Sequence, residues 1–312
     1  MARRAQIWRI EAYRPKGSPL IPRDTRKQNE LTQVTLSAWS KINLGLRIVG
    51  KRPDGYHNLI TRFQRLSLND VVSLYPSSSG VQYQGQRLTD KPEQNLTVKA
   101  AESFLKVFGG YGVKITVTKR IPVGAGLGGG SSDAAAVLRG MAITHNVKPD
   151  DPRLFEIGAE IGSDVPFFLM DTSSAIGESK GEVLRGVEGI PTSLWVTILY
   201  PGFEISTTRA YKEFDNTLTP PIESDTFRVH SLHESDAAGS RINYINDFEK
   251  LAFDAHPELN VTRDYLIQAG ALSAGLAGSG SSLFAIFDDE TKARSAATQR
   301  RASWLGFVCR PC

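Results

Sequence analysis

The chain has 312 residues, 40% of them hydrophobic and 22% charged, which is the composition of a globular protein large enough for two domains. No stretch approaches the roughly 18 apolar residues that a membrane span needs, so we expect a soluble protein. The net charge is +4, and residues 1–30 alone contribute +5, so the other 282 residues sum to −1. The nearly neutral body argues against a nucleic-acid partner.

The basic head, residues 1–32, is predicted to be disordered because it has several prolines and little apolar periodicity. It lacks the apolar core of a secretory signal, and its three acids and single serine leave plastid targeting as a minor alternative. Cys309 and Cys312 form a terminal pair without the context of a zinc or redox site. We therefore expect a reducing, cytoplasmic compartment and no structural metal.

Strand-like and helical segments alternate along the chain, which predicts an α+β architecture. Residues 35–49 are predicted to form a strand, followed by a turn at 51–55 and a second strand from Leu59. Residues 95–108 have helical spacing and end at a glycine pair. Residues 113–118 alternate apolar and polar side chains, which is typical of a strand with one face in solvent.

A helix is expected at residues 132–138, with its N-terminus capped by Ser132 or Asp133. Gly186, Gly189 and Pro191 cluster at 186–192 and predict a boundary between two domains there. The expected domains are residues 33–188 and 189–312. Further elements are expected as follows: a strand at 193–200, a long loop or insertion at 213–240, and helices at 247–253 and 261–268.

A glycine-rich run extends from Pro122 to Ser132 and contains five glycines in the seven positions 124–130. Glycine can adopt positive φ and let the backbone approach a ligand closely, and a following helix directs N–H groups and its positive dipole end at that ligand. The run is therefore predicted to bind phosphate. A flexible linker is the alternative, but linkers do not usually join a patterned strand directly to an alanine-rich helix.

Two familiar phosphate motifs do not fit this run. Gly124, Gly126 and Gly129 satisfy the spacing of the dinucleotide-binding fingerprint. The strand before them has one polar face, however, whereas the first strand of that fold is buried on both faces. The Walker motif requires a lysine after the glycines, and none is present. A different kind of phosphate loop is needed.

The run resembles the Pro-x-x-Gly-x-Gly-Leu-Gly-Ser/Gly-Ser-Ser loop of the GHMP kinase superfamily. Six further blocks follow in the family's order and extend the resemblance over residues 34–312: residues 38–44, 52–57, 161–168, 201–211, 246–249 and 278–281. The Asp54-Gly55-Tyr56-His57 turn is closest to one branch, the kinases of 4-diphosphocytidyl-2-C-methyl-D-erythritol. Ala277 departs from the Ser or Thr that is usual before the last block.

The resemblance implies the two-domain GHMP kinase fold. Its N-terminal domain is like domain 2 of ribosomal protein S5, its C-terminal domain is ferredoxin-like, and the active site lies in the cleft between them. It also implies ATP-dependent phosphorylation of the 2-hydroxyl of that cytidine-diphosphate derivative in non-mevalonate isoprenoid biosynthesis. Mg²⁺ would be held mainly by phosphates and water.

The resemblance implies that Lys41 and Asp164 are catalytic. Asp164 is expected beside the attacking hydroxyl, and Lys41 within reach of both the aspartate and the γ-phosphate. Whether Asp164 removes the proton or orients the alcohol stays open. Asn95 and Lys99 are expected near the adenine of ATP. The other ATP-binding residues implied by the family pattern are Pro122, Gly124, Ala125, Gly126, Leu127, Gly128, Gly129, Gly130, Ser131 and Ser132.

For the second substrate, the resemblance places Asn43 near the reacting hydroxyl. Tyr56 and Tyr211 are expected to stack on the two faces of the cytosine, with His57 at its edge. Gly278, Ser279 and Gly280 are expected to offer backbone N–H groups to the diphosphate.

Two alternatives remain. One is another GHMP enzyme, of the homoserine kinase or diphosphomevalonate decarboxylase type, and Tyr56, His57 and Tyr211 argue against it because neither enzyme binds a cytidine. The other is a non-catalytic nucleotide-binding regulator, which the presence of Lys41 and Asp164 disfavours. We expect a monomer or homodimer with small-molecule partners only.

Overall fold

The computed structural model describes residues 33–86, 94–216, 242, 244–298 and 302–312. The predicted basic head and most of the loop predicted at 213–240 lie outside these residues. The chain divides into two compact units, each discontinuous in sequence. Unit 1 holds Met1–Ala38, Asn69–Arg120 and Gly129–Leu169, and unit 2 holds Trp39–Leu68, Ile121–Gly128 and Met170–Cys312. The domains expected at 33–188 and 189–312 stay a prediction.

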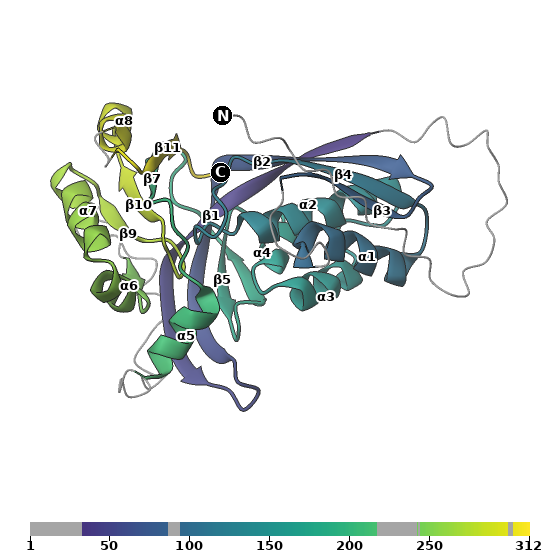
Figure 1. The fold of residues 1–312 in the computed structure, drawn as a ribbon, viewed down its shortest axis with the longest axis horizontal. Coiled ribbons are helices and arrows are strands. Elements are labelled where there is room, and N and C mark those ends of the chain that lie inside the picture. The colour runs from purple at the N-terminus through teal and green to yellow at the C-terminus, as the bar shows by residue number, and fades with distance from the viewer. Residues whose placement is uncertain (1–32, 87–93, 217–241, 243, 299–301) are drawn as a thin grey trace. The chain divides into compact units, whose positions relative to one another are not determined.

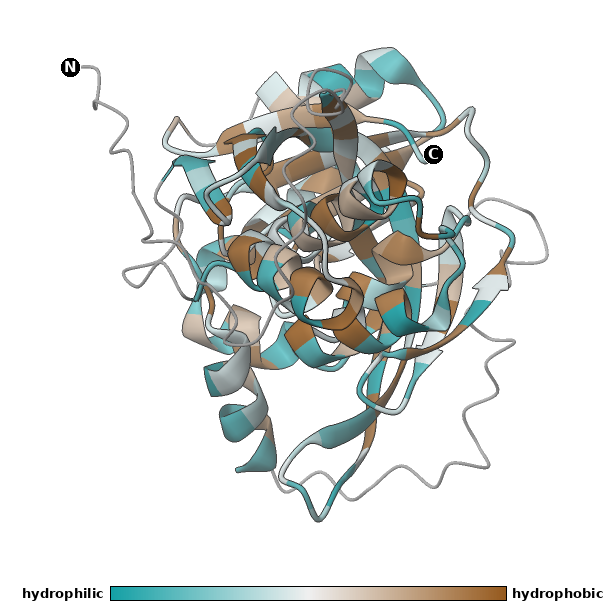
Figure 2. Cartoon of the chain, turned by 90° about the vertical axis from the view of Figure 1, so that its right-hand side faces the viewer, coloured by the Kyte–Doolittle hydropathy of each residue, from teal (hydrophilic) through white to brown (hydrophobic). Residues whose placement is uncertain are grey.

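In unit 1, helices cover one face of a sheet (Figure 1). Strand β4 (Gly112–Thr118) pairs antiparallel with the later part of β2 (His57–Ser77) and parallel with β3 (Val81–Gly85). The helices that pack together there are α1 (Leu96–Phe108), α2 (Gly129–Thr144), α3 (Pro152–Ile161) and α4 (Val165–Leu169). Figure 2 shows the mixture of hydrophobic and hydrophilic residues expected of helices with one buried side.

The predicted alternation in β4 is confirmed. Val113, Ile115 and Val117 are buried, whereas Thr118 at the end of the strand is exposed. The helix expected at 95–108 is also confirmed as α1. Its N-cap is Asn95, whose side chain accepts a hydrogen bond from the Thr97 N–H at 2.9 Å, and it ends at Gly109 with φ of 72°.

The predicted start of the next helix is wrong. Helix α2 begins at Gly129, so Ser132 and Asp133 lie inside it and do not cap it. The physical reason is that the Asp133 carboxylate is fully buried and accepts a hydrogen bond from the Lys119 ammonium at 2.7 Å. Its side chain is therefore directed into unit 1 and away from the N–H groups of the first helical turn.

Unit 2 contains a four-stranded antiparallel sheet in the order β11-β7-β10-β9. Its strands are β7 (Trp195–Tyr200), β9 (Ser273–Leu276), β10 (Leu283–Phe287) and β11 (Leu305–Cys309). Every residue of β10 is buried, and successive residues belong to two apolar clusters, as with Leu283 in one and Phe284 in the other. The sheet is therefore covered on both faces, with α7 (Pro257–Gln268) and α8 (Glu290–Thr298) packed against it.

The remaining elements of unit 2 carry most of the candidate site. Residues from β1 (Val34–Lys51) and the first part of β2 belong to it, with β5 (Ser174–Glu178), β6 (Val183–Val187), β8 (Ile245–Asn246), α5 (Thr207–Asp215) and α6 (Glu249–Ala255). Strand β5 pairs antiparallel with β2 and with β6. The loop expected from 213 is wrong at its start, because 213–215 are the last residues of α5.

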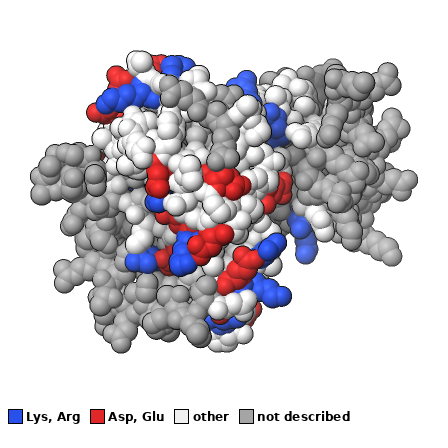
Figure 3. Space-filling view, turned by 60° about the vertical axis from the view of Figure 1, so that its left-hand side comes forward, with Lys and Arg blue, Asp and Glu red and all other residues white. Residues whose placement is uncertain are grey.

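Basic and acidic side chains lie next to one another on the face that Figure 3 shows. Two pairs one helical turn apart are Lys250 with Asp254 and Arg294 with Glu290. Such exposed pairs contribute little stability, and their mixture of signs gives this part of the surface no field of a single sign.

Candidate active site

Two glycine loops of unit 2 lie backbone against backbone. Gly126 has φ of +78°, and a Cβ atom added there would lie 2.0 Å from the Ala277 carbonyl oxygen. A Cβ atom on Gly278, with φ of +59°, would lie 3.0 Å from the Gly126 carbonyl oxygen. The Ser282 N–H also donates to the Ala125 carbonyl at 3.2 Å. The structure thus brings together the glycine run and the late glycine loop, residues 278–281, and only glycine fits at position 126.

Ala125 and Leu127, both in the predicted ATP set, have side chains that point into the apolar core of unit 2. Their carbonyl oxygens accept bonds from the N–H groups of Ser282 and Lys41, at 3.2 and 3.0 Å. Any contact of these two residues with a nucleotide would therefore come from their backbone N–H groups. These two apolar side chains anchor the run, and the glycines next to them in sequence carry no side chain that would cover its backbone.

Lys41 on β1 is buried, although a strand lysine usually faces water. Its ammonium donates to Asn43 Oδ1 at 2.8 Å, and Asn43 Nδ2 donates to Thr61 Oγ1 at 2.7 Å. Thr61 in turn donates to the Gly45 carbonyl at 2.7 Å. A Cβ atom on Gly278 would lie 3.4 Å from both Lys41 Nζ and Asn43 Oδ1. This series of hydrogen bonds fixes a cation against the late glycine loop, where an anion is expected.

Thr61 escaped the sequence analysis because an isolated threonine in a strand carries no chemical signal. Asn246 was found within a motif but received no role. Its amide donates to the carbonyls of Leu276 and Gly278, at 3.0 and 2.7 Å, so it holds both ends of the turn into the late loop. Glu249 accepts a bond from the Leu276 N–H at 3.2 Å, and burial raises the pKa of that carboxyl.

The late loop is also tied to α5. The hydroxyls of Ser279 and Thr207, the first residue of α5, are 2.9 Å apart, and the Ser281 hydroxyl donates to the Phe203 carbonyl. Ser279 is buried, and the Gly280 N–H already donates to the Ala277 carbonyl at 2.9 Å. The role of residues 278–280 as N–H donors to the diphosphate therefore stays a prediction.

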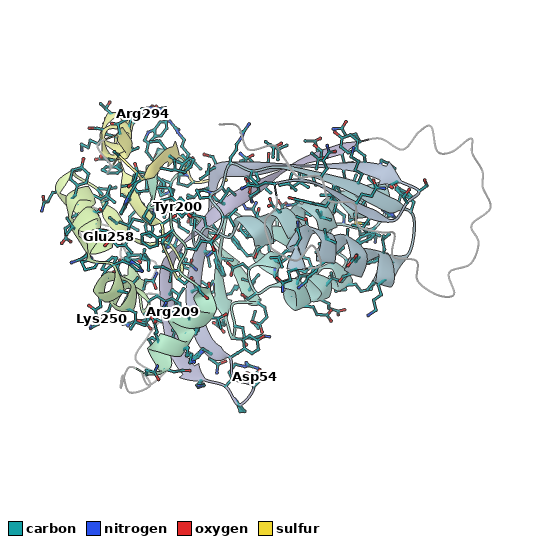
Figure 4. The ribbon with its side chains drawn as sticks, in the orientation of Figure 1. Asp54, Tyr200, Arg209, Lys250, Glu258 and Arg294 are labelled. Carbon is teal, nitrogen blue, oxygen red and sulfur yellow. The ribbon has the colours of Figure 1, made fainter. Side chains whose placement is uncertain are left out.

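The turn between β1 and β2 carries Asp54 near its tip (Figure 4). The Arg52 N–H donates to the Tyr56 carbonyl at 2.7 Å and closes the turn. The Tyr56 ring is 60% exposed, and the Lys180 ammonium lies 4.9 Å from its centroid. The ammonium lies over one face of this exposed ring, so a ligand would stack on the other face.

His57 and Tyr211 are brought together, with ring centroids 4.9 Å apart and planes 16° from parallel. His57 is buried, and its Nε2 lies 2.7 Å from Asp215 Oδ1. Asp215 Oδ2 accepts a bond from Lys51 at 2.7 Å, and hydrogen bonds from Lys51 and His57 lower the Asp215 pKa. Asp215 thereby orients the His57 ring, and Nδ1 is the ring nitrogen that it does not engage. Sequence analysis missed Asp215 because it fell in the expected loop.

The predicted site residues of unit 1 lie around the start of α2. Asp164 is half-buried in the turn between α3 and α4, where the Val165 N–H donates to the Gly162 carbonyl at 3.0 Å. A Cβ atom on Gly162 would lie 3.7 Å from the Ser131 hydroxyl, so this turn adjoins the first turn of α2. On another side, a Cβ atom on Gly130 would lie 3.6 Å from Leu96, the residue after Asn95. Lys99, one turn along α1, is exposed.

No cluster of three or more His, Cys, Asp or Glu side chains able to hold a metal occurs within the described residues. Cys309 and Cys312 are both free, and burial raises the pKa of the Cys309 thiol to about 12. Within the same residues, no helix is long and apolar enough to cross a membrane.

Comparison with known protein families finds two matches. The family of GHMP kinases N terminal domains matches residues 95–172, and the family of GHMP kinases C terminal domains matches residues 230–304. The chain is similar to a 4-diphosphocytidyl-2-C-methyl-D-erythritol kinase of Geobacter sp. (strain M21). The two are 38% identical over 285 residues, which cover 90% of this chain and 99% of the relative.

Solved structures agree with this similarity. A crystal structure of 4-(cytidine 5'-diphospho)-2C-methyl-D-erythritol kinase superposes with a TM-score of 0.73 at 33% identity, covering 88% of this chain and 98% of that one. A homoserine kinase from Cytophaga hutchinsonii superposes with a TM-score of 0.69 at 19% identity, covering 89% and 95%. The second likeness concerns the fold alone. The predicted α+β GHMP kinase fold is confirmed.

Proposed function

The chain belongs to the GHMP kinase family, and from that membership we propose that it phosphorylates the 2-hydroxyl of 4-diphosphocytidyl-2-C-methyl-D-erythritol with ATP. The products would be the 2-phosphate and ADP, in isoprenoid precursor biosynthesis. The observation that carries the proposal is the buried Lys41 ammonium, held by Asn43 against the late glycine loop. The similarity to a kinase of that substrate along 90% of the chain supports the choice of substrate.

Phosphoryl transfer depends on in-line positioning and on neutralising the charge of the transferring group. In the proposed reaction, Lys41 stabilises that charge, and its fixed position means that little reorganisation accompanies the transfer. Asp164 orients the 2-hydroxyl and accepts its proton as the oxygen attacks the γ-phosphorus. Backbone N–H groups of residues 124–132 and the start of α2 hold the triphosphate.

Mg²⁺ would accompany ATP and neutralise charge on the phosphate oxygens. In this proposal the ion is held mainly by phosphates and water, with the hydroxyls of Ser131 and Ser132 nearby. Asn95 is proposed near the adenine, although its side-chain oxygen already caps α1.

Choice of the alcohol is proposed to depend on the pyrimidine. The exposed Tyr56 ring and the Tyr211 ring stack on the base, while His57, oriented by Asp215, meets its edge. Cytosine presents an amino group and a ring nitrogen at that edge, so an oriented imidazole can discriminate it from bases without that pattern. Asn43 is proposed near the reacting oxygen, although its amide already bonds to Lys41 and Thr61.

The proposal is tested by measuring ADP release from purified protein with Mg²⁺ and ATP. The candidate substrates are the cytidine compound, homoserine and mevalonate derivatives. We expect turnover with the cytidine compound only. Turnover with homoserine or a mevalonate derivative instead would move the chain to another branch of the family, and no turnover with any of them would support a non-catalytic regulator.

A further inference from the structure

A buried ionic cluster in unit 1 has no part in the proposed reaction. Lys119 follows β4, Asp70 lies on β2, and Asp133 is the fifth residue of α2. The Lys119 ammonium donates to Asp133 Oδ2 at 2.7 Å and to Asp70 Oδ2, and Asp70 Oδ1 accepts a bond from the Arg120 N–H. Both carboxylates are fully buried, and the Lys119 side chain is only 7% exposed.

Stability alone does not explain such a cluster. Two carboxylates share one ammonium, and Asp133 Oδ1 has no hydrogen-bond partner among the described residues. Desolvation of buried ion pairs offsets most of their attraction, so apolar side chains of similar volume would stabilise the fold as well or better. The cluster is better explained by the geometry that it imposes.

That geometry concerns the glycine run. Lys119 lies three residues before the run at 122–132, and Asp133 directly follows it. The chain leaves unit 1 after Arg120 and returns to it at Gly129. The contact between them therefore ties together the two ends of the run, and Asp70 fastens the tie to β2. A run with five glycines has many accessible conformations. Fixing its ends removes part of the entropy that a ligand would otherwise have to overcome.

Lys119 is not available to bind phosphate, because both of its neighbours are carboxylates and it is almost fully buried. Although burial disfavours its charged form, those carboxylates raise the Lys119 pKa. From β3, Tyr83 faces the same two acids, and burial with their charges raises its pKa to about 12. The tyrosine is therefore neutral, and the charges of the cluster come from the lysine and the two aspartates, of which Asp133 has a pKa raised by burial to about 7.

We propose that Asp133 is a positioning residue for ATP, which acts through Lys119 to hold the glycine run in the geometry that binds the triphosphate. The inference rests on the proposed function, because it requires the run to bind ATP.

The test is calorimetric titration at pH 8 with a non-hydrolysable ATP analogue and Mg²⁺. Asp133→Ala is expected to weaken binding by roughly 5- to 150-fold, the usual range of coupling between separate groups in a protein. Asp133→Asn keeps an acceptor for Lys119 but loses the charge, and should weaken binding by about threefold. The matched control is Thr197→Val in unit 2, which removes a buried hydrogen bond to the Ala293 carbonyl at 2.8 Å. It should lower the melting temperature and leave the affinity unchanged.

Affinity of Asp133→Ala within twofold of wild type, with a lowered melting temperature, would show a structural role only and overturn the inference. If Asp133→Ala does not fold, the test relies on steady-state kinetics of Asp133→Asn. An unchanged KM for ATP in Asp133→Asn overturns the inference. A raised KM for ATP, with kcat and the KM for the alcohol unchanged, supports it. Wild-type protein that binds no analogue would overturn the proposed function as well, so the two failures are distinguishable.

Discussion

Within unit 2, the surroundings proposed for the phosphates and those proposed for the base are built in different ways. The phosphate region is made of backbone and buried groups, where Gly126 packs against the Ala277 carbonyl and Lys41 is held by Asn43. The base region is made of side chains, with the Tyr56 ring 60% exposed and His57 held by Asp215. A substitution in the phosphate region must therefore displace backbone, whereas an aromatic ring in the base region can be replaced without moving the backbone.

This difference separates two properties of the enzyme. The phosphate region should decide whether phosphoryl transfer occurs, and changes there should affect kcat or ATP binding. The base region should decide which alcohol reacts, and changes there should affect the KM for the alcohol. Variants in the two regions test whether these two properties change independently.

The largest effect is expected for Asp164→Ala. Removing the proposed proton acceptor should lower kcat by about 10³-fold or more and leave binding of the ATP analogue intact. Steady-state rates and calorimetry measure the two quantities. The control is the neighbouring Ser163→Ala, since Ser163 is exposed and should be replaceable at full activity. Full activity in Asp164→Ala would remove this residue from the mechanism.

The second-largest effect is expected for Gly126→Ala. A Cβ atom there would lie 2.0 Å from the Ala277 carbonyl oxygen at a φ of +78°, so the two loops must separate. We expect ATP binding to weaken by about 100-fold, as for ångström-scale misplacements. Gly186→Ala on β6 is the matched control, because its added Cβ atom would meet nothing closer than 3.7 Å. Equal affinity in the two variants would contradict the packing of the loops as a functional feature.

Tyr211→Ala should have a smaller and more selective effect. Stacking of a base on an aromatic ring contributes about 1–3 kcal/mol, so the KM for the cytidine compound should rise roughly 5- to 150-fold. The KM for ATP should not change. Tyr211→Phe keeps the ring and should retain most of the affinity. A fall in kcat without a change in the KM for the alcohol would show that the base region also affects phosphoryl transfer, and would contradict the separation of the two regions.

The smallest effect is expected for the pH dependence of the free energy of unfolding, through Asp133. Burial raises the Asp133 pKa from 3.8 to about 7, despite the opposing charge of Lys119. The folded protein thus holds this proton more tightly than the unfolded chain, so its contribution is complete below about pH 3.8 and is lost as the pH rises towards 7. Denaturant unfolding should show a decline in the free energy of unfolding over this window that is weaker in Asp133→Asn.

Asp151→Asn is the control of opposite sign for this measurement. A hydrogen bond from Arg153 lowers the Asp151 pKa, so its contribution is present above the ordinary aspartate range and is lost as the pH falls. Identical pH slopes in wild type and Asp133→Asn would contradict the raised pKa.

Local signals predicted much of the fold. The alternation of residues 113–118 and the glycine pair after Phe108 gave β4 and α1 correctly. Strand β10 had no such signal, because it is buried on both faces and its sequence is uniformly apolar. The predicted start of α2 was wrong because the Asp133 side chain contacts Lys119, and this contact overrides the preference of aspartate for the N-cap position.

The site residues that lie within sequence motifs could be predicted. The glycines, Lys41 and Asp164 stand in blocks that carry the family resemblance. Thr61 and Asp215 act through other residues, and no local pattern distinguishes a threonine or aspartate that orients a neighbour from one that faces solvent. Their roles depend on pairs more than 15 residues apart in sequence, which only the folded chain brings into contact.

Phosphorylation of the 2-hydroxyl can be observed directly by ³¹P NMR of the reaction products. With ATP, Mg²⁺ and 4-diphosphocytidyl-2-C-methyl-D-erythritol, we expect ADP and a new phosphomonoester on the 2-hydroxyl, with the cytidine diphosphate linkage intact. ADP accompanied only by inorganic phosphate, or cleavage of the diphosphate, would contradict this expectation.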